Sequence, residues 1–216
     1  MRLLLLNPNT DFRTTAVMCE VAQAAASRNV SVEGATAGFG VPLITNEAAL
    51  ETAAQAVAAA VEAISTRPDG VIVAAFGDPG LEAARAGLSC PVTGIAEAAM
   101  AEAGLDGRPF AVVTTTPDLV AAIGRRAALY GFGHGYVGTY VTSGDPAAVT
   151  ADPERAASAF VALCHEARRD GAAAIVVGGG PLAIAARRLA ATAPLPVIEP
   201  VPAAVRLAER RAAGRA

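Results

Sequence analysis

Residues 71–81, Val-Ile-Val-Ala-Ala-Phe-Gly-Asp-Pro-Gly-Leu, and residues 174–182, Ala-Ile-Val-Val-Gly-Gly-Gly-Pro-Leu, are two versions of one pattern. In each, a run of apolar residues suited to a buried strand leads into a turn rich in glycine and proline. An alanine- and arginine-rich helical stretch follows both turns, and a Pro-Val strand then begins at Pro91 or at Pro196. The chain therefore contains a repeated strand–turn–helix–strand unit, which predicts two similar halves.

The repeat extends toward the start of each half. Residues 3–11, Leu-Leu-Leu-Leu-Asn-Pro-Asn-Thr-Asp, resemble residues 110–118, Phe-Ala-Val-Val-Thr-Thr-Thr-Pro-Asp. We therefore expect an N-terminal lobe over residues 1–105 and a C-terminal lobe over residues 106–216. A last helix near 202–213 is expected to pack back on the first lobe.

Short apolar runs alternate with alanine-rich helical stretches along the whole chain. Most of these runs lack period-2 alternation, as expected for parallel strands covered by helices on both faces. The predicted strands are 3–6, 30–33, 71–74, 110–114, 136–140, 174–177 and 196–198. The predicted helices are 11–28, 46–65, 80–87, 95–104, 117–129, 152–170, 181–192 and 202–213. The predicted fold class is therefore α/β, with two pseudo-symmetric lobes, each a short parallel sheet flanked by helices.

The composition favours a folded protein over a membrane-spanning or secreted one. Hydrophobic residues make up 53% of the 216 residues, but no stretch approaches the ~20 apolar residues that span a bilayer. The apolar run 3–6 ends at Asn7, too early for the ~7–15 apolar residues of a secretory signal. Cys19, Cys90 and Cys164 are far apart and odd in number, which favours small buried side chains in a reducing, cytoplasmic compartment.

The charge pattern argues against nucleic acid, metal and nucleotide as partners. The formal net charge is −3, the 17 basic residues are scattered, and aromatic residues make up 4%, so no surface for nucleic acid is expected. His134 and His165 lack metal-ligand spacing, and the glycine run 178–180 lacks the GxGxxG and Walker patterns. We expect a small-molecule ligand, no membrane partner and no cofactor.

Turn residues follow four of the predicted strands. They form the loops 7–10, 75–80, 114–116 and 178–181. Parallel α/β sheets bind ligands beyond the carboxyl ends of their strands. If the two lobes face each other, these loops meet in one cleft, so the sequence predicts an active-site cleft between the lobes.

The same loops resemble the hydantoin and allantoin racemase branch of the aspartate/glutamate/hydantoin racemase superfamily. The matching motifs are residues 7–10 (NPNT), 76–81 (FGDPGL), 91–99 (PVTGIAEAA) and 112–115 (VVTT), in order and spacing. The resemblance covers nearly the whole chain. It implies a cofactor-independent racemase or epimerase, commonly a homo-oligomer, that acts on a small hydantoin-like or amino-acid-like substrate with an acidic C–H.

The family's mechanism uses two cysteines, one on each lobe, that flank the acidic carbon. One thiolate removes the proton, and the opposite thiol delivers a proton to the other face. The resemblance places these cysteines at Ala75 and Gly179, and neither residue can carry a proton. The two-thiol mechanism is therefore absent. Ala75 fits both a natural member with altered chemistry and an engineered Cys-to-Ala change.

The remaining loop residues are candidates for binding and chemistry. Asp78 and Glu199 are the candidate acid/base residues, each weighed against a capping or surface role. Threonines beside helix N-termini suit a carboxylate or imide oxygen. The glycine run 178–180 brings backbone N–H groups close to a ligand, as an oxyanion hole requires. The predicted binding residues are Asn7, Thr10, Ala75, Phe76, Gly77, Asp78, Thr115, Thr116, Gly179, Gly180 and Pro181.

Three functions remain open at this point. Racemisation or epimerisation is the family default. A cysteine-less lyase, decarboxylase or cyclase would use Asp78 or Glu199, or water, to move protons. A non-catalytic ligand-binding member would keep the cleft and lack the chemistry.

Overall fold

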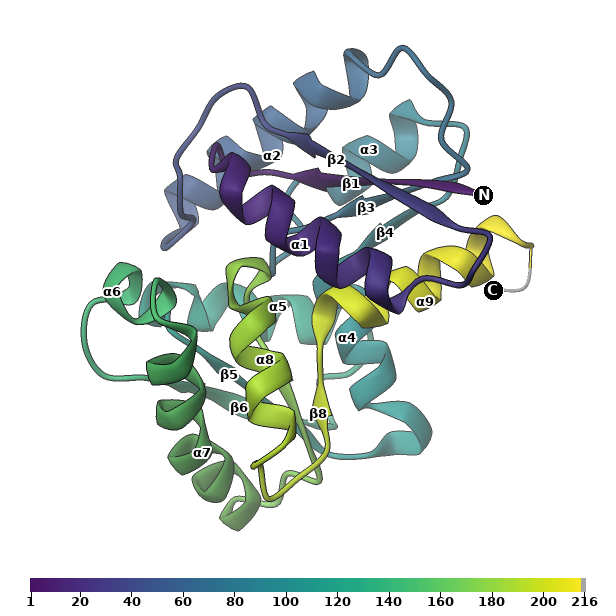
Figure 1. Ribbon diagram of the computed structural model, residues 1–216. Helices are drawn as coiled ribbons and strands as arrows, with labels where there is room; N and C mark the ends of the chain where they lie inside the picture. The colour runs from purple at the N-terminus through teal and green to yellow at the C-terminus, as the bar shows by residue number, and fades with distance from the viewer. Residues whose placement is uncertain (215–216) are drawn as a thin grey trace.

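Two separate four-stranded parallel sheets form the framework of the protein (Figure 1). The computed structural model describes residues 1–214. The first sheet contains β1 (Arg2–Asn7), β2 (Ser31–Thr36), β3 (Gly70–Val73) and β4 (Val92–Gly94). The second contains β5 (Phe110–Thr114), β6 (Tyr136–Val141), β7 (Ala174–Val177) and β8 (Val197–Ile198). Their orders are β2-β1-β3-β4 and β6-β5-β7-β8, so the second sheet repeats the first. The predicted α/β class with two pseudo-symmetric lobes is confirmed.

Almost every helix between the strands lies where the sequence predicts a helix. They are α1 (Phe12–Ala25), α2 (Glu47–Glu62), α3 (Leu81–Gly87), α4 (Ile95–Ala103), α5 (Val120–Leu129), α6 (Pro146–Thr150), α7 (Pro153–Arg169), α8 (Ala183–Ala190) and α9 (Pro200–Ala212). Only α6 was not predicted, although Asp145 caps it by accepting from the Ala148 N–H and Pro146 opens it. No helix within residues 1–214 is both long and apolar enough to cross a membrane.

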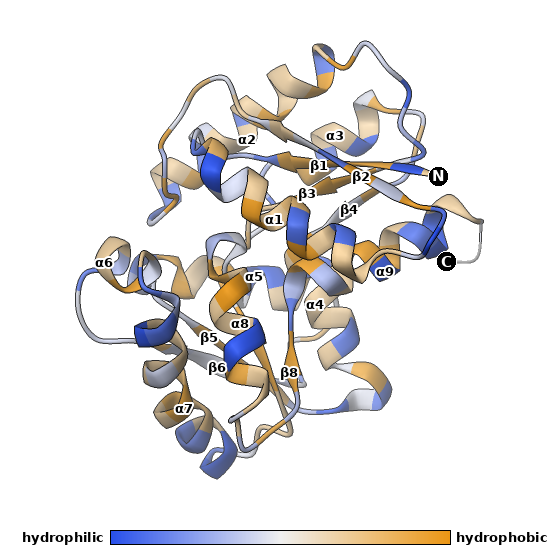
Figure 2. Ribbon diagram, viewed as in Figure 1, coloured by the Kyte–Doolittle hydropathy of each residue, from blue (hydrophilic) through white to orange (hydrophobic). Residues whose placement is uncertain are grey.

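The central strands are buried on both faces because alternate residues enter different cores. In the first sheet, Leu3, Leu5 and Ile72 pack toward α1, whereas Leu6 and Val71 pack toward α2 and α3. The second sheet divides its side chains between two cores in the same way. Figure 2 shows the apolar colouring concentrated along the central strands. The edge strands β2 and β6 remain partly exposed, which fits their polar and glycine content.

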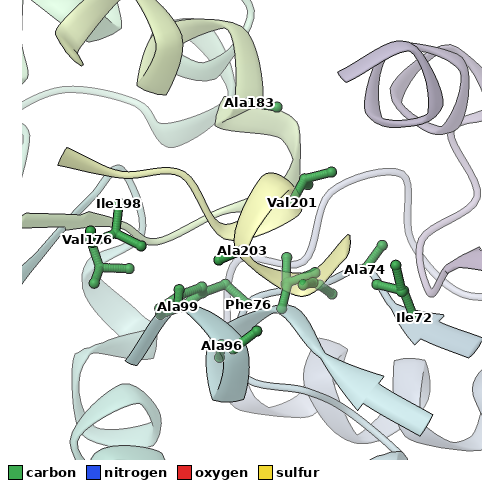
Figure 3. Packing of buried hydrophobic residues seen from close by; sticks show 14 of the residues in the cluster. Ile72, Ala74, Phe76, Ala96, Ala99, Val176, Ala183, Ile198, Val201 and Ala203 are labelled. Carbon is green, nitrogen blue, oxygen red and sulfur yellow. The ribbon is translucent and has the colours of Figure 1, made fainter. Parts of the chain in front are cut away.

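The last helix of each half packs against the sheet of the other half. Helix α4 follows β4 but contacts β7 and β8, and α9 follows β8 but contacts β3 and β4. The two helices also pack against each other. Figure 3 shows Ala96 and Ala99 of α4 beside Val201 and Ala203 of α9, close to Phe76. One continuous core therefore runs through both lobes and fixes their relative position.

Glu97 joins α4 to α9 and α3 through two arginines. Its Oε2 lies 2.7 Å from Arg85 Nη2 and 2.8 Å from Arg211 Nη1. Burial alone would raise the pKa of Glu97, but the hydrogen bonds and charges of Arg211 and Arg85 outweigh it and lower the pKa to about 2. The folded state therefore binds the Glu97 proton more weakly than the unfolded chain does, and the site stabilises the fold above about pH 4.5.

The substitution Glu97→Gln is expected to lower the free energy of unfolding at pH 7 by about 2–3 kcal/mol. The difference between the wild-type protein and the variant should shrink as the pH falls from about 4.5 to 2, because the wild-type carboxylate then takes up its proton. Urea unfolding across this pH range measures it. Glu102→Gln is the matched control, since Glu102 pairs with Arg206 on the exposed side of α4 and should change stability by less than ~1 kcal/mol. Equal losses for the two variants would contradict the argument.

Candidate functional site

A cavity lies between the two lobes, at the carboxyl ends of the central strands. The space between its walls, including the open mouth, is about 450 Å³. The lining comes from the loops after β1, β3, β5 and β7, from the segment before α2 and from α6. The lining residues are Asn9, Leu43, Ile44, Ala74, Ala75, Phe76, Thr115, Thr116, Leu119, Thr150, Gly178, Gly179, Gly180, Pro181 and Leu182.

The loops after β3 and β7 are in direct contact beside this cavity. A Cβ placed on Gly178 would lie 3.3 Å from the Phe76 ring, so the ring packs on the glycine backbone. A Cβ placed on Gly180 would lie 2.7 Å from the Ala74 carbonyl oxygen. Only glycine allows this approach of one backbone to another. The glycine run therefore brings the two lobes together at the cavity.

Ala75 and Gly179, the positions where the family resemblance places cysteines, both line the cavity. The atoms nearest to a Cβ at Gly179 belong to the Leu182 side chain, with Cδ1 at 2.9 Å and Cγ at 3.1 Å. A larger residue at position 179 therefore requires the buried Leu182 side chain to shift. Neither Ala75 nor Gly179 supplies an ionisable group.

The polar side chains of the cavity are all uncharged. Asn9, Thr115, Thr116 and Thr150 supply them, and no acidic, basic, cysteine or tyrosine side chain within residues 1–214 belongs to the lining. In that same part of the chain, no three His, Cys, Asp or Glu side chains are grouped so that they could hold a metal ion. The lining can therefore donate and accept hydrogen bonds but offers no carrier for a proton.

Asp78, one of the two predicted acid/base residues, lies outside the cavity. Its side chain is 0% exposed and accepts hydrogen bonds from Ala96 N (2.9 Å), Glu97 N (2.8 Å) and the Tyr130 hydroxyl (2.7 Å). Burial raises the pKa of Asp78 to about 6, against these hydrogen bonds, which favour the charged form. The expected position of Asp78 in the cleft is corrected: its carboxylate caps α4 and joins it to Tyr130.

Glu199, the second predicted acid/base residue, also lies outside the lining, at the N-terminus of α9. Its Oε2 is 3.8 Å from Arg187 Nε and accepts no hydrogen bond within residues 1–214. The hydroxyl of Tyr140, in β6, donates a hydrogen bond to Asp170 at 2.6 Å. None of these groups belongs to the cavity lining.

Three predicted binding residues support the cavity from behind rather than line it. Asn7 is fully buried and holds Asn9 through its side chain. The Thr10 N–H donates to Val41 O at 3.0 Å, which anchors the segment that carries Leu43 and Ile44. Gly77 has φ +113°, which a side chain rarely adopts. The predicted residues that do line the cavity are Ala75, Phe76, Thr115, Thr116, Gly179, Gly180 and Pro181.

Several lining residues were not predicted from the sequence. Asn9 lies within the Asn-Pro-Asn-Thr motif, and its position two residues beyond β1 was a usable signal. Thr150 comes from the unpredicted α6 and shares a hydrogen bond of 3.0 Å with Thr115. Leu43 and Ile44 come from an irregular segment whose path no sequence pattern indicated.

Comparisons with known proteins point to one family. The family model described as "Asp/Glu/Hydantoin racemase" matches residues 3–208. A hydantoin racemase from Paenarthrobacter aurescens is 29% identical over 218 residues, which cover 97% of this chain and 90% of the relative. The solved structure of allantoin racemase from Klebsiella pneumoniae matches with a TM-score of 0.92 and 33% identity, covering 100% of this chain and 89% of that chain. The structure of allantoin racemase from Pseudomonas fluorescens gives a TM-score of 0.91 and 32% identity, with 97% and 89% covered. The chain therefore belongs to the Asp/Glu/hydantoin racemase family.

Proposed function

We propose that the protein binds a small neutral cyclic ureide of the hydantoin or allantoin type, with its acidic C–H between positions 75 and 179. The observation that carries this proposal is the uncharged lining of the cavity. An amino-acid zwitterion or a dicarboxylate would bury its charges there without an oppositely charged partner, which is costly. A cyclic ureide is neutral and matches amide, hydroxyl and backbone groups. The names of the relatives, hydantoin racemase and allantoin racemase, support the same ligand class.

We further propose that the unmodified chain does not carry out two-base racemisation. That reaction needs a proton carrier on each face of the acidic carbon, and Ala75 and Gly179 provide none. The lyase, decarboxylase or cyclase alternative is weakened, because Asp78 and Glu199, its candidate acid/base residues, lie outside the lining. A ligand-binding member that keeps the cleft is therefore favoured over both enzymes. The family resemblance also supports a homo-oligomer. The free cysteines support a cytoplasmic location.

Titration calorimetry and proton NMR in D₂O test the two proposals separately. Enantiopure 5-benzylhydantoin and allantoin should bind, whereas aspartate and glutamate should not bind at the same concentrations. No deuterium should enter C5 faster than in protein-free buffer. Tight binding of the charged amino acids would overturn the ligand class. Protein-dependent exchange with loss of enantiomeric excess would instead show that racemisation proceeds through other groups.

A further inference from the structure

The two lobes place one polar side chain each at equivalent positions of the cavity. Asn9 follows the end of β1 by two residues, and Thr116 follows the end of β5 by two residues. Both side chains line the cavity, and both are held by the last residue of the preceding strand, Asn7 or Thr114. The hydrogen bonds behind them decide what each side chain can offer a ligand.

The orientation of the Asn9 amide is fixed by backbone groups. The Asp11 N–H, which can only donate, bonds to Asn9 Oδ1 at 2.9 Å. Asn7 Nδ2 donates to the same oxygen at 2.7 Å, and Asn7 is itself oriented because its Oδ1 accepts from the Asn9 N–H at 3.2 Å. Asn9 Oδ1 is therefore occupied on the protein side.

The Asn9 Nδ2 is left for the cavity. Within residues 1–214 it donates no hydrogen bond, and it is not fully sealed from solvent. Because Asn9 is only 3% exposed and lines the cavity, the cavity is the route by which Nδ2 is reached. Asn9 thus offers a ligand donors and no acceptor.

Thr116 offers a ligand the opposite of Asn9, an acceptor and no donor. The Thr114 hydroxyl donates its single hydrogen to Gly178 O at 2.8 Å, since a carbonyl oxygen can only accept. The 3.1 Å contact between the Thr114 and Thr116 hydroxyls must then be donated by Thr116. The hydrogen of Thr116 is committed, and only its oxygen lone pairs remain for a ligand.

We propose that Asn9 and Thr116 together recognise an O=C–N–H edge of the substrate, an inference that rests on the ureide ligand class proposed above. Asn9 Nδ2 donates to a ring carbonyl, and the Thr116 hydroxyl oxygen accepts from a ring N–H. Because the two lobes present opposite polarity at equivalent positions, the ligand binds in one direction although the fold is pseudo-symmetric. This fixes which face of the acidic carbon is turned toward position 75 and which toward position 179.

The variant Asn9→Asp tests the donor. An aspartate oxygen still accepts from the Asp11 N–H and from Asn7, so the loop keeps its structural hydrogen bonds. The cavity-facing donor becomes an acceptor. We expect the affinity for 5-benzylhydantoin, measured by calorimetry on the folded variant, to fall at least about tenfold. Unchanged affinity would overturn the role of Asn9.

N-methylated ligands test the acceptor. We expect 1-methyl- or 3-methyl-5-benzylhydantoin to bind wild-type protein about tenfold more weakly than the parent compound. This penalty should disappear in Thr116→Val, which removes the acceptor at similar size, and persist in Thr116→Ser. Thr115→Val is the matched control, because the Thr115 hydroxyl pairs with Thr150, and it should keep the penalty.

The outcomes separate this inference from the proposed function. A penalty that persists in Thr116→Val is steric and overturns the role of Thr116. A wild-type protein that binds 5-benzylhydantoin while neither Asn9→Asp nor Thr116→Val changes recognition overturns the inference and leaves the proposed function standing. A wild-type protein that binds neither 5-benzylhydantoin nor allantoin overturns both.

Discussion

The double variant Ala75→Cys/Gly179→Cys is expected to racemise 5-benzylhydantoin at least ~100-fold faster than the unmodified chain, the lower end of what a positioned acid/base contributes. Both positions line the cavity on opposite lobes, so a thiolate on one face could remove the C5 proton while a thiol on the other face returns one. At position 179 the new Cβ requires the Leu182 side chain to move. The uncharged groups proposed to bind the ring line the same cavity.

Each single cysteine variant has its own expected result. A lone thiolate removes the C5 proton and returns a solvent deuteron to the same face. NMR in D₂O should therefore show deuterium entering C5 while chiral chromatography shows the enantiomeric excess retained. The exchanging enantiomer should differ between Ala75→Cys and Gly179→Cys, because the two positions are proposed to face opposite sides of the carbon.

Serine provides the control for the cysteine variants. Ala75→Ser/Gly179→Ser has nearly the same shape but lacks a group that ionises near neutral pH. It should bind the hydantoin and leave C5 unexchanged at pH 8. Racemisation by the serine pair, or none by a cysteine pair that binds the ligand, would contradict the assignment of positions 75 and 179.

The sheets and the cavity loops could be predicted from the sequence because their signals are local. Strands such as β3 and β7 are continuous apolar runs that end in glycine- and proline-rich turns, and parallel topology sends those turns to one edge. The internal repeat supplied the two lobes. The sequence alone therefore predicts that the loops carrying Ala75 and Gly179 lie at this edge.

What could not be predicted depends on contacts between distant segments. Asp78 stands in a predicted site loop, but its carboxylate is taken by the N–H groups of α4, and no local pattern shows this. The packing of α4 against β7 and β8 is likewise set by contacts between distant segments. The polarity of Asn9 depends on which backbone groups bond to it. The sequence shows where polar residues lie along the chain, but only the structure shows which of their atoms remain free to bond a ligand.

Asp78 holds the loop after β3, residues 75–80, to the rest of the protein. Its N–H donates to the Ala75 carbonyl at 3.0 Å and so closes the turn that carries Ala75. Its φ of +50° is unusual for a residue with a side chain. A Cβ placed on Gly94 would overlap the carboxylate, so the Asp78 pocket is closely packed. The loop therefore depends on the bonds from Ala96, Glu97 and Tyr130.

The variant Asp78→Ala is expected to lose about 3–5 kcal/mol of unfolding free energy at pH 4.5. Three buried donors lose their acceptor, and an unpaired buried donor costs ~1–3 kcal/mol. Tyr130→Phe is the matched control, because it removes one donor and leaves the two backbone bonds to α4 in place. It should lose ~1 kcal/mol.

The unfolding free energy lost in Asp78→Ala should also shrink as the pH rises, whereas the loss in Glu97→Gln shrinks as the pH falls. The pKa of Asp78 is raised from 3.8 to about 6 in the fold, so the folded state binds this proton more tightly than the unfolded chain. The stabilisation linked to Asp78 is complete below about pH 3.8 and is lost as the pH passes through about 6. The gap between wild type and Asp78→Ala should therefore narrow by about 2–3 kcal/mol between pH 4 and pH 7.5. Urea unfolding at several pH values measures this gap; one that stays constant or widens would show that Asp78 is charged throughout this range, held so by Tyr130 and the α4 N-terminus.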